Sequence, residues 1–222
     1  MTVVMLLILL GLGTWQVRRL AWKEAILAQI AQAEAAPPMP LPTGPEASIP
    51  APFTKVAVTG TLMHNLSALY AAEVRDTRAG PELGALLIEP LQREGAPPLL
   101  VDRGWVPIKR SAPVAEPPGA VTIAGYVHQA DTPGVFSPHD DLAGRHFYTL
   151  DPSAIGATLG LDRVAPFILI AMGPPPPEGL PIPADHLPRP PNNHLQYAIT
   201  WYGLAAALVV IFTVWVRRAA RE

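Results

Sequence analysis

Apolar positions gather in two uninterrupted runs, one at each end of the chain. The first is Val3–Trp15, and no charged residue occurs before Arg18. The second is Gln196–Val216, which carries no formal charge and would span about 31 Å as a helix rising 1.5 Å per residue. A bilayer core needs about 20 apolar residues. We therefore predict transmembrane helices over residues 1–17 and 194–216.

The first run could also be a signal peptide, because such peptides are likewise apolar and N-terminal. It has no basic region before it and no small-x-small cleavage site. It ends instead in Trp15, Gln16, Arg18 and Arg19, a combination of aromatic and basic residues that is typical of a membrane interface. We interpret it as an uncleaved membrane anchor.

Between the two runs the pattern changes to a helix and then to short strands. Residues Arg18–Ala35 are rich in helix-forming Ala, Leu, Lys, Glu and Gln, and Pro37 and Pro38 end this pattern. Short alternating or apolar runs typical of strands follow: Phe53–Leu62, Leu66–Glu73, Gly84–Leu91, Pro98–Asp102 leading into 103–107, Ala120–His128, His146–Leu150 and Val164–Met172. Pro152–Leu159 is a candidate short helix with Asp151 as its N-cap.

The pattern predicts a membrane protein in which two transmembrane helices flank a mostly β soluble domain, a small barrel or sandwich with one or two short helices. The expected order is a first transmembrane helix (1–17), a juxtamembrane helix (18–36), a Pro-rich linker (37–52), the β domain (53–173), a Pro-rich connector (174–191), the second transmembrane helix (194–216) and a basic tail (217–222).

Composition supports this division and narrows the possible chemistry. The chain contains 28 prolines, which interrupt helices and central strands and so favour short strands and rigid loops in the middle. It has no cysteine, which excludes disulfides, thiolate zinc sites and iron–sulfur clusters. The net charge of −2 gives no indication of nucleic-acid binding.

The charges near the membrane suggest an orientation. Residues 217–222 form a short basic tail, which favours the cytoplasm for the C-terminus and the periplasm for the β domain. Arg18, Arg19 and Lys23 would then lie on the outer side, but long domains cross a membrane largely regardless of charge. No Arg-rich transit segment precedes the first run, so we expect the bacterial inner membrane.

The middle of the chain offers little catalytic chemistry. Hydrolase, zinc-protease and P-loop motifs are absent from the sequence, and we identify no catalytic residue and no protein metal centre. His139, Asp140, Asp141 and His146 read as a polar loop. Arg103, Gly104 and Trp105 form either a partner-docking turn or a strand end with a tight glycine turn and an aromatic anchor, and the residues alone favour the second interpretation.

His194 is the most interesting polar residue, because it precedes the second apolar run at the membrane surface. On a helix it shares a face with Tyr197 and Trp201. A haem needs an axial nitrogen ligand and an apolar slot. The residues alone favour an ordinary interfacial histidine over a haem ligand. Asn192 and Asn193 could orient the imidazole or cap the helix.

Three motifs together resemble one known family. Residues 12–23 (LGTWQVRRLAWK), 101–107 (VDRGWVP) and 192–203 (NNHLQYAITWYG) are similar, in order and spacing, to motifs of the Surfeit-locus family of cytochrome c oxidase assembly factors. The resemblance covers essentially the whole chain. The Pro-rich stretches 37–52 and 174–191 read as local additions to the family pattern.

The resemblance implies a chaperone that binds haem a and assists its insertion into subunit I of a haem–copper oxidase, not an enzyme. The implied cofactor is haem a, held transiently through His194. The residues implied to surround it are Tyr197, Trp201, Trp15, Gln16 and Arg19. The implied partners are oxidase subunit I, possibly haem a synthase, and membrane lipid.

Other interpretations remain at this point. A scaffold could hold subunit I in an open state without touching haem. A haem-modifying enzyme would need a nucleophile or an acid–base pair, which the sequence does not suggest. A two-span sensor would need an output domain, for which the short segment after Val216 leaves no room.

Overall fold

The computed structural model describes residues 1–42, 49–77, 80–109, 112–134, 137–189 and 191–221. The chain forms two compact units, and each is described by itself. The helical unit comprises Met1–Gln32 and Pro188–Glu222. The β unit comprises Ala33–Leu187.

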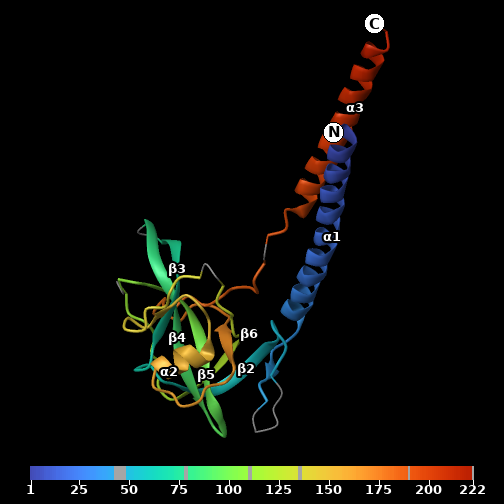
Figure 1. Ribbon diagram of the computed structural model, residues 1–222. Coiled ribbons are helices and arrows are strands. Elements are labelled where there is room, and N and C mark those ends of the chain that lie inside the picture. The colour runs from blue at the N-terminus through green and yellow to red at the C-terminus, as the bar shows by residue number, and fades with distance from the viewer. Residues whose placement is uncertain (43–48, 78–79, 110–111, 135–136, 190, 222) are drawn as a thin grey trace. The chain divides into compact units, whose positions relative to one another are not determined.

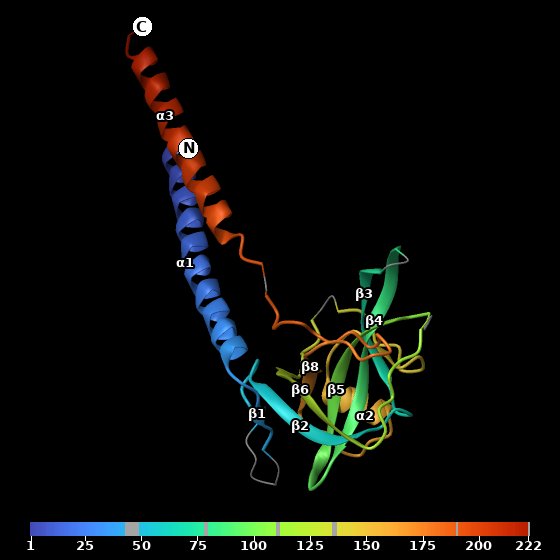
Figure 2. The ribbon, with the colours of Figure 1, turned by 180° about the vertical axis from the view of Figure 1, so that it is seen from behind.

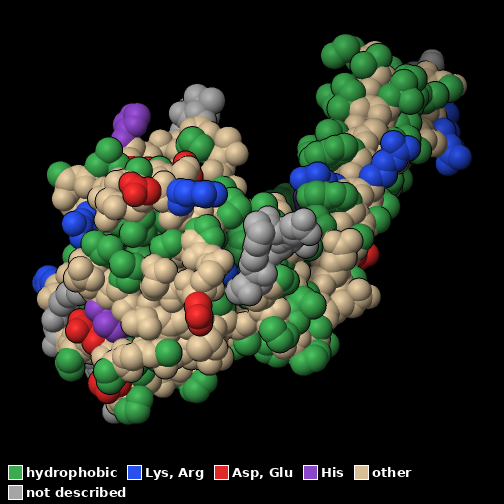
Figure 3. Space-filling view, turned by 90° about the horizontal axis from the view of Figure 1, so that it is seen from below, with side chains coloured by type: hydrophobic (Ala, Val, Ile, Leu, Met, Phe, Trp, Pro, Cys, Tyr) green, Lys and Arg blue, Asp and Glu red, His purple; other side chains and the backbone are tan. Residues whose placement is uncertain are grey.

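Two long helices make up most of the helical unit. Helix α1 spans Thr2–Ala35 and helix α3 spans His194–Ala219, and they lie side by side in antiparallel directions (Figure 1). Both helices are long and apolar enough to cross a membrane. Hydrophobic side chains cover much of their visible surface (Figure 3), and Val210 and Ile211 are among the most exposed of them.

Helix α1 runs without a break through the predicted membrane span at 1–17 and the predicted juxtamembrane helix at 18–36. Its 34 residues would extend about 51 Å, which is longer than a bilayer core. The predicted start of the second helix at His194 is confirmed. Helix α3 continues to Ala219, three residues beyond the predicted end of the span.

The β unit is built on one sheet of eight described strands: β1 (Met39–Pro40), β2 (Lys55–Leu62), β3 (Ala68–Thr77), β4 (Gly80–Arg93), β5 (Ala96–Pro107), β6 (Ala120–Gln129), β7 (His146–Phe147) and β8 (Phe167–Ala171). The order is β1-β2-β6-β8-β5-β4-β3-β7, with an additional pairing of β2 with β4. That pairing returns the sheet to β2, so the strands β2, β6, β8, β5 and β4 close on themselves. The barrel alternative is therefore correct, and the sandwich is not.

Apolar side chains from several strands fill this closed sheet. Val56 and Val58 on β2 are buried, as are Leu99 and Val101 on β5 and Leu169 on β8. Successive side chains on a strand point to opposite faces, and β5 and β8 are buried on both of theirs. This core fixes the positions of the strands that carry the central motif.

Helix α2 (Pro152–Thr158) is the short helix of the β unit, drawn in front of the sheet in Figure 1 and behind it in Figure 2. Its predicted N-cap is confirmed, because the Asp151 side chain accepts a hydrogen bond of 2.9 Å from the backbone N–H of Ser153. Ile155 anchors the helix and is fully buried.

Several predicted strands differ in length from the observed ones. Strands β3 and β4 form a longer hairpin than predicted, reaching Thr77 and Gly80 at its described end (Figure 2). The last predicted strand before α2, His146–Leu150, is reduced to the two residues of β7, which pair in parallel with Leu69 and Tyr70. Periodicity predicted the type of these elements, but their lengths depend on pairing between distant segments.

The Pro-rich stretches do more than link elements. Met39 and Pro40 pair with Val56 and Ala57, so part of the linker 37–52 joins the sheet; its residues 43–48 lie outside the described part. In the connector 174–191, Ile182 pairs with Trp105 and Ala184 pairs with Met172. These segments of the two Pro-rich stretches therefore belong to the β domain, and their interpretation as additions to the family pattern stays a prediction.

Candidate functional site

His194 opens helix α3, and its imidazole is held by a side chain of α1. Its Nδ1 lies 2.7 Å from Oε1 of Gln16, a residue 9% exposed. An amide oxygen can only accept, so Nδ1 donates this hydrogen bond. Among the described residues Nε2 has no hydrogen-bond partner. The neutral ring therefore presents a lone pair at Nε2.

Close helix packing produces this contact. A Cβ added to Gly13 would lie 2.9 Å from the Tyr202 ring, so only glycine allows the helices to approach this closely without a shift. The Tyr202 hydroxyl lies 3.1 Å from Oγ1 of Thr14. The small buried residues Ala198 and Ala205 lie on the same helix as Tyr202. Small residues of this kind let membrane helices pack tightly.

The other predicted residues near the membrane are more exposed. Trp15 is 54% exposed and Tyr197 is 53% exposed, whereas Trp201 is half-buried. The Arg19 guanidinium lies 3.8 Å from the centre of the Trp22 ring. Within the described part of the chain, no hydrogen bond or ring contact joins these residues to His194. The structure therefore brings together His194 and Gln16, and a haem-contacting role for all of these residues stays a prediction.

The roles suggested for the two asparagines are not observed. Asn193 is the N-cap residue of α3, but its side chain makes no capping hydrogen bond. Asn192 carries a buried side-chain oxygen that has no partner among the described residues. The imidazole of His194 is oriented by Gln16, on the other helix.

The central motif forms a β-bulge inside strand β5. Leu86 pairs with Trp105 and Ile88 pairs with Asp102, so the β5 side has one more residue than the β4 side. Gly104 has φ +117°, which L side chains rarely adopt, and its N–H donates a 2.8 Å hydrogen bond to Asp102 Oδ1. The motif is a glycine turn within a strand that continues, and not at a strand end as predicted.

Arg103 belongs to a buried charge network. Its guanidinium donates to Glu89 Oε2 at 2.9 Å and to the carbonyl of Ala115 at 2.7 Å. His64 Nδ1 lies 3.0 Å from the same carboxylate oxygen, and its Nε2 lies 3.3 Å from the carbonyl of Pro117. Sequence analysis missed Glu89 and His64. A lone carboxylate inside the apolar run Gly84–Leu91 was the available signal, since buried acids are nearly always paired.

Trp105 anchors the motif to two other segments. It is 1% exposed, and its indole Nε1 donates a 3.0 Å hydrogen bond to the carbonyl of Glu73. Its backbone exchanges hydrogen bonds with Ile182. The geometry favours the structural interpretation of Arg103, Gly104 and Trp105; a partner-binding role for them stays a prediction.

Asp102 is the most perturbed acid of the described chain. Burial raises its pKa from 3.8 to about 7, although the N–H of Gly104 and the charge of Arg75 act in the opposite direction. Burial also raises the pKa of Tyr126, and the Asp102 charge adds to that effect. Asp102 on β5 and Tyr126 on β6 both pair with Ile170 on β8, which lies between these two strands.

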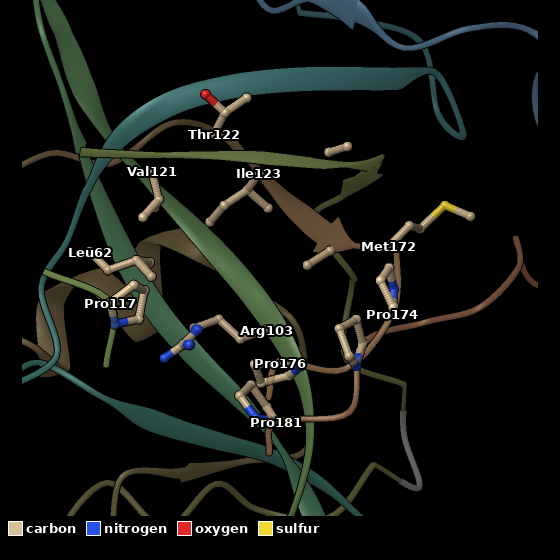
Figure 4. Close-up of a pocket in the computed structure, with 13 residues that line it drawn as sticks. Leu62, Arg103, Pro117, Val121, Thr122, Ile123, Met172, Pro174, Pro176 and Pro181 are labelled. Atoms are coloured by element: carbon tan, nitrogen blue, oxygen red, sulfur yellow. The ribbon is translucent and has the colours of Figure 1, made fainter. Parts of the chain in front are cut away.

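A cavity of about 290 Å³ lies beside the motif, near the lower limit of about 300 Å³ for small-molecule sites. Its walls are mostly apolar, and Figure 4 shows the Arg103 side chain near Pro117 and Pro181. Among the described lining residues, Met172 is the one that could ligate iron, and none is a histidine. Across the described residues, no group of three or more His, Cys, Asp or Glu side chains is placed to hold a metal ion. This cavity therefore contains no described nitrogen ligand for an iron.

Two helices apolar enough to cross a membrane, together with a closed β sheet, are features of a membrane-anchored protein with a β domain. Residues 3–206 match the model of the SURF1 family. The chain belongs to the SURF1 family, the same Surfeit-locus family that its three motifs resemble. This is a family of assembly factors and not a class of enzymes.

Individual relatives agree over most of their length. The chain is 30% identical to Surfeit locus protein 1 of Takifugu rubripes, over 89% of this chain and 88% of the relative. It is 30% identical to Surfeit locus protein 1 of Homo sapiens, over 89% of this chain and 70% of the relative. A SURF1-like protein of Rickettsia conorii is 29% identical, over 95% of this chain and 88% of the relative.

Proposed function

We propose that this protein is a cytochrome c oxidase assembly factor that binds haem a through Nε2 of His194 and assists its insertion into subunit I. One observation carries the proposal. The imidazole has its Nδ1 engaged by Gln16, and its Nε2 has no partner within the described residues. An imidazole nitrogen with a free lone pair is the axial ligand that a haem requires.

The surroundings of His194 fit such a cargo. Trp201 lies two turns along α3, on the same face as His194. The exposed apolar side chains of α1 and α3 offer a surface for an isoprenoid tail. Arg19, one turn along α1 from Gln16, supplies an exposed guanidinium for a propionate. Trp15, Tyr197 and Trp201 supply aromatic faces for the macrocycle.

A single ligand also suits a carrier. A closed site with two protein ligands would retain its cargo, whereas one open ligand position allows transfer to a partner. The proposed partners are therefore the acceptor, oxidase subunit I, and possibly the haem a synthase that supplies the cargo. Membrane lipid surrounds the two helices.

We place the protein in a bacterial inner membrane, with the β unit in the periplasm and the C-terminus in the cytoplasm. The observation behind this orientation is the basic end of α3, where Arg217 and Arg218 occupy the last turn. Relatives in Rickettsia support a bacterial setting.

The test is complementation of a haem a-producing host that lacks its own assembly factor. We expect the parent to restore haem a in subunit I and His194→Ala to fail. Leu195→Ala is the matched control, because Leu195 is its exposed neighbour on the same helical turn; it should behave like the parent.

The scaffold alternative makes the opposite prediction. If the protein only holds subunit I, His194→Ala will restore oxidase maturation fully, and deletion of residues 33–187 will abolish it. That pair of results would overturn the haem-carrier proposal.

A further inference from the structure

Gln16 is the one polar residue on the buried face of helix α1. The buried residues of α1 within the predicted membrane span are Leu9, Gly13 and Gln16, at the spacing of one helical face. A buried amide in an apolar interface costs free energy unless it is hydrogen bonded. A leucine could fill this position without that cost. The buried amide is therefore explained by its partner, His194.

The contact determines which nitrogen of His194 carries the proton. Gln16 Oε1 accepts from Nδ1 at 2.7 Å, so the neutral ring is held as the Nδ1–H tautomer. That tautomer exposes the Nε2 lone pair. A free histidine in water prefers the other tautomer, in which Nε2 carries the proton and cannot bind a metal.

The contact also restricts the rotation of the ring. Gln16 is on α1 and His194 is on α3, so the position of the imidazole depends on the pairing of the two helices. Partners of this kind orient metal-binding histidines and raise their basicity, and their loss typically weakens metal affinity about 10–100-fold.

We propose that Gln16 is a positioning residue that fixes the tautomer and orientation of His194 and does not itself contact the haem. The part of this inference that concerns haem rests on the proposed function of His194. The predicted tautomer of His194 in the haem-free protein is independent of that proposal. It replaces the sequence-based assignment of Gln16 as a haem-contacting residue.

The first experiment needs no haem. Nitrogen NMR of histidine-labelled full-length protein in nanodiscs, without haem, reports the tautomer of His194, with His194→Ala to assign the signal. We expect the Nδ1–H form in the parent and a shift toward the Nε2–H form in Gln16→Leu. Tyr202→Phe is the control, because it removes the other hydrogen bond between the helices, to Thr14, and leaves Gln16 in place. An Nε2–H tautomer in the parent, or no change in Gln16→Leu, would overturn the proposal.

The second experiment measures haem binding and the reduction potential of the bound haem. In Gln16→Leu we expect haem affinity to fall about 10-fold or more. Gln16→Glu should retain haem and lower its reduction potential, since a carboxylate acceptor makes Nε2 a stronger donor to ferric iron. Tyr202→Phe should match the parent in both measurements.

The outcomes separate the two proposals. If His194→Ala loses haem while Gln16→Leu keeps the affinity and potential of the parent, the haem role of His194 stands and the positioning role of Gln16 is wrong. If His194→Ala keeps its haem, the ligand assignment is wrong, although the tautomer measurement can still confirm the contact with Gln16.

Discussion

Trp105 and Ile182 exchange two backbone hydrogen bonds, of 2.8 and 2.9 Å, between strand β5 and the Pro-rich connector. This pairing places the connector directly on the central motif. It also explains why the motif contains glycine, because a Cβ at position 104 would collide with the backbone of Ile182 and Pro183. The motif is therefore one of the places where the connector is attached to the sheet, together with the pairing of Ala184 with Met172.

We predict that Gly104→Ala destabilises the β unit and detaches the connector. An L residue in such a backbone conformation costs about 1–2 kcal/mol, and the collision with Ile182 adds to this cost. Gly119→Ala is the control, because Gly119 also has positive φ but has open space around it. Thermal unfolding of the full chain in detergent should show a clearly larger loss for Gly104→Ala. Equal losses would mean that the close approach to Ile182 is unimportant.

Asp102 should make stability depend on pH. Its pKa is about 7 in the folded protein against the ordinary value of 3.8 for an aspartate, so the folded state binds more protons than the unfolded state between these pH values. Stability should therefore fall as pH rises from about 4 to about 7 and then level off. Each pKa unit corresponds to about 1.4 kcal/mol, so the effect should amount to a few kcal/mol.

Asp102→Asn should remove this pH dependence. At pH values above 7 the variant should unfold at a higher temperature than the parent, because it buries no charge and its amide oxygen still accepts from the N–H of Gly104. The measurement is the thermal midpoint across the pH range, with the exposed Asp162→Asn as control. If stability falls with rising pH equally in the parent and in Asp102→Asn, Asp102 is not the cause of the pH dependence.

The ion pair between Arg103 and Glu89 should show strong coupling. Arg103→Met leaves a buried carboxylate without its cation, which typically costs about 3–5 kcal/mol. The double variant Arg103→Met/Glu89→Met should be less destabilised than the sum of the single variants, by about 0.5–3 kcal/mol. A double-mutant cycle of unfolding free energies checks this, and strict additivity would show that the pair contributes no specific interaction.

The helix pairing should depend on Gly13. Gly13→Leu places a side chain against the Tyr202 ring and should separate α1 from α3, whereas Gly11→Leu should not, because Gly11 has open space around it. The chain has no cysteine of its own, so spin labels at Val17→Cys and Ile199→Cys, both exposed positions, report the distance between the helices. A broadened distance distribution in Gly13→Leu alone is expected. The same broadening in both variants would argue against close packing at Gly13.

The sequence correctly predicted those structural features that depend on the local pattern of residues. The alternation in Phe53–Leu62 correctly predicted a strand, which is observed as β2. Asp151 before a short apolar segment correctly predicted an N-cap. Both features depend only on neighbouring residues, so a short stretch of sequence is enough to predict them.

The sequence could not predict contacts that depend on pairing between distant segments. Gln16 and His194 lie at opposite ends of the chain, and nothing local indicates that they meet. The bulge at Gly104 depends on its register with Leu86 and Ile88. The attachment of Ile182 to Trp105 was missed because a Pro-rich stretch looks like a linker when read by itself.

The most direct test of the central claim is the visible absorption spectrum of the protein purified from membranes of a haem a-producing host. We predict a haem a spectrum in the parent and in the control Leu195→Ala, and its loss in His194→Ala. A colourless parent with subunit I co-purifying would contradict the account and favour a scaffold. Equal haem in the parent and His194→Ala would show that haem binds through a different residue.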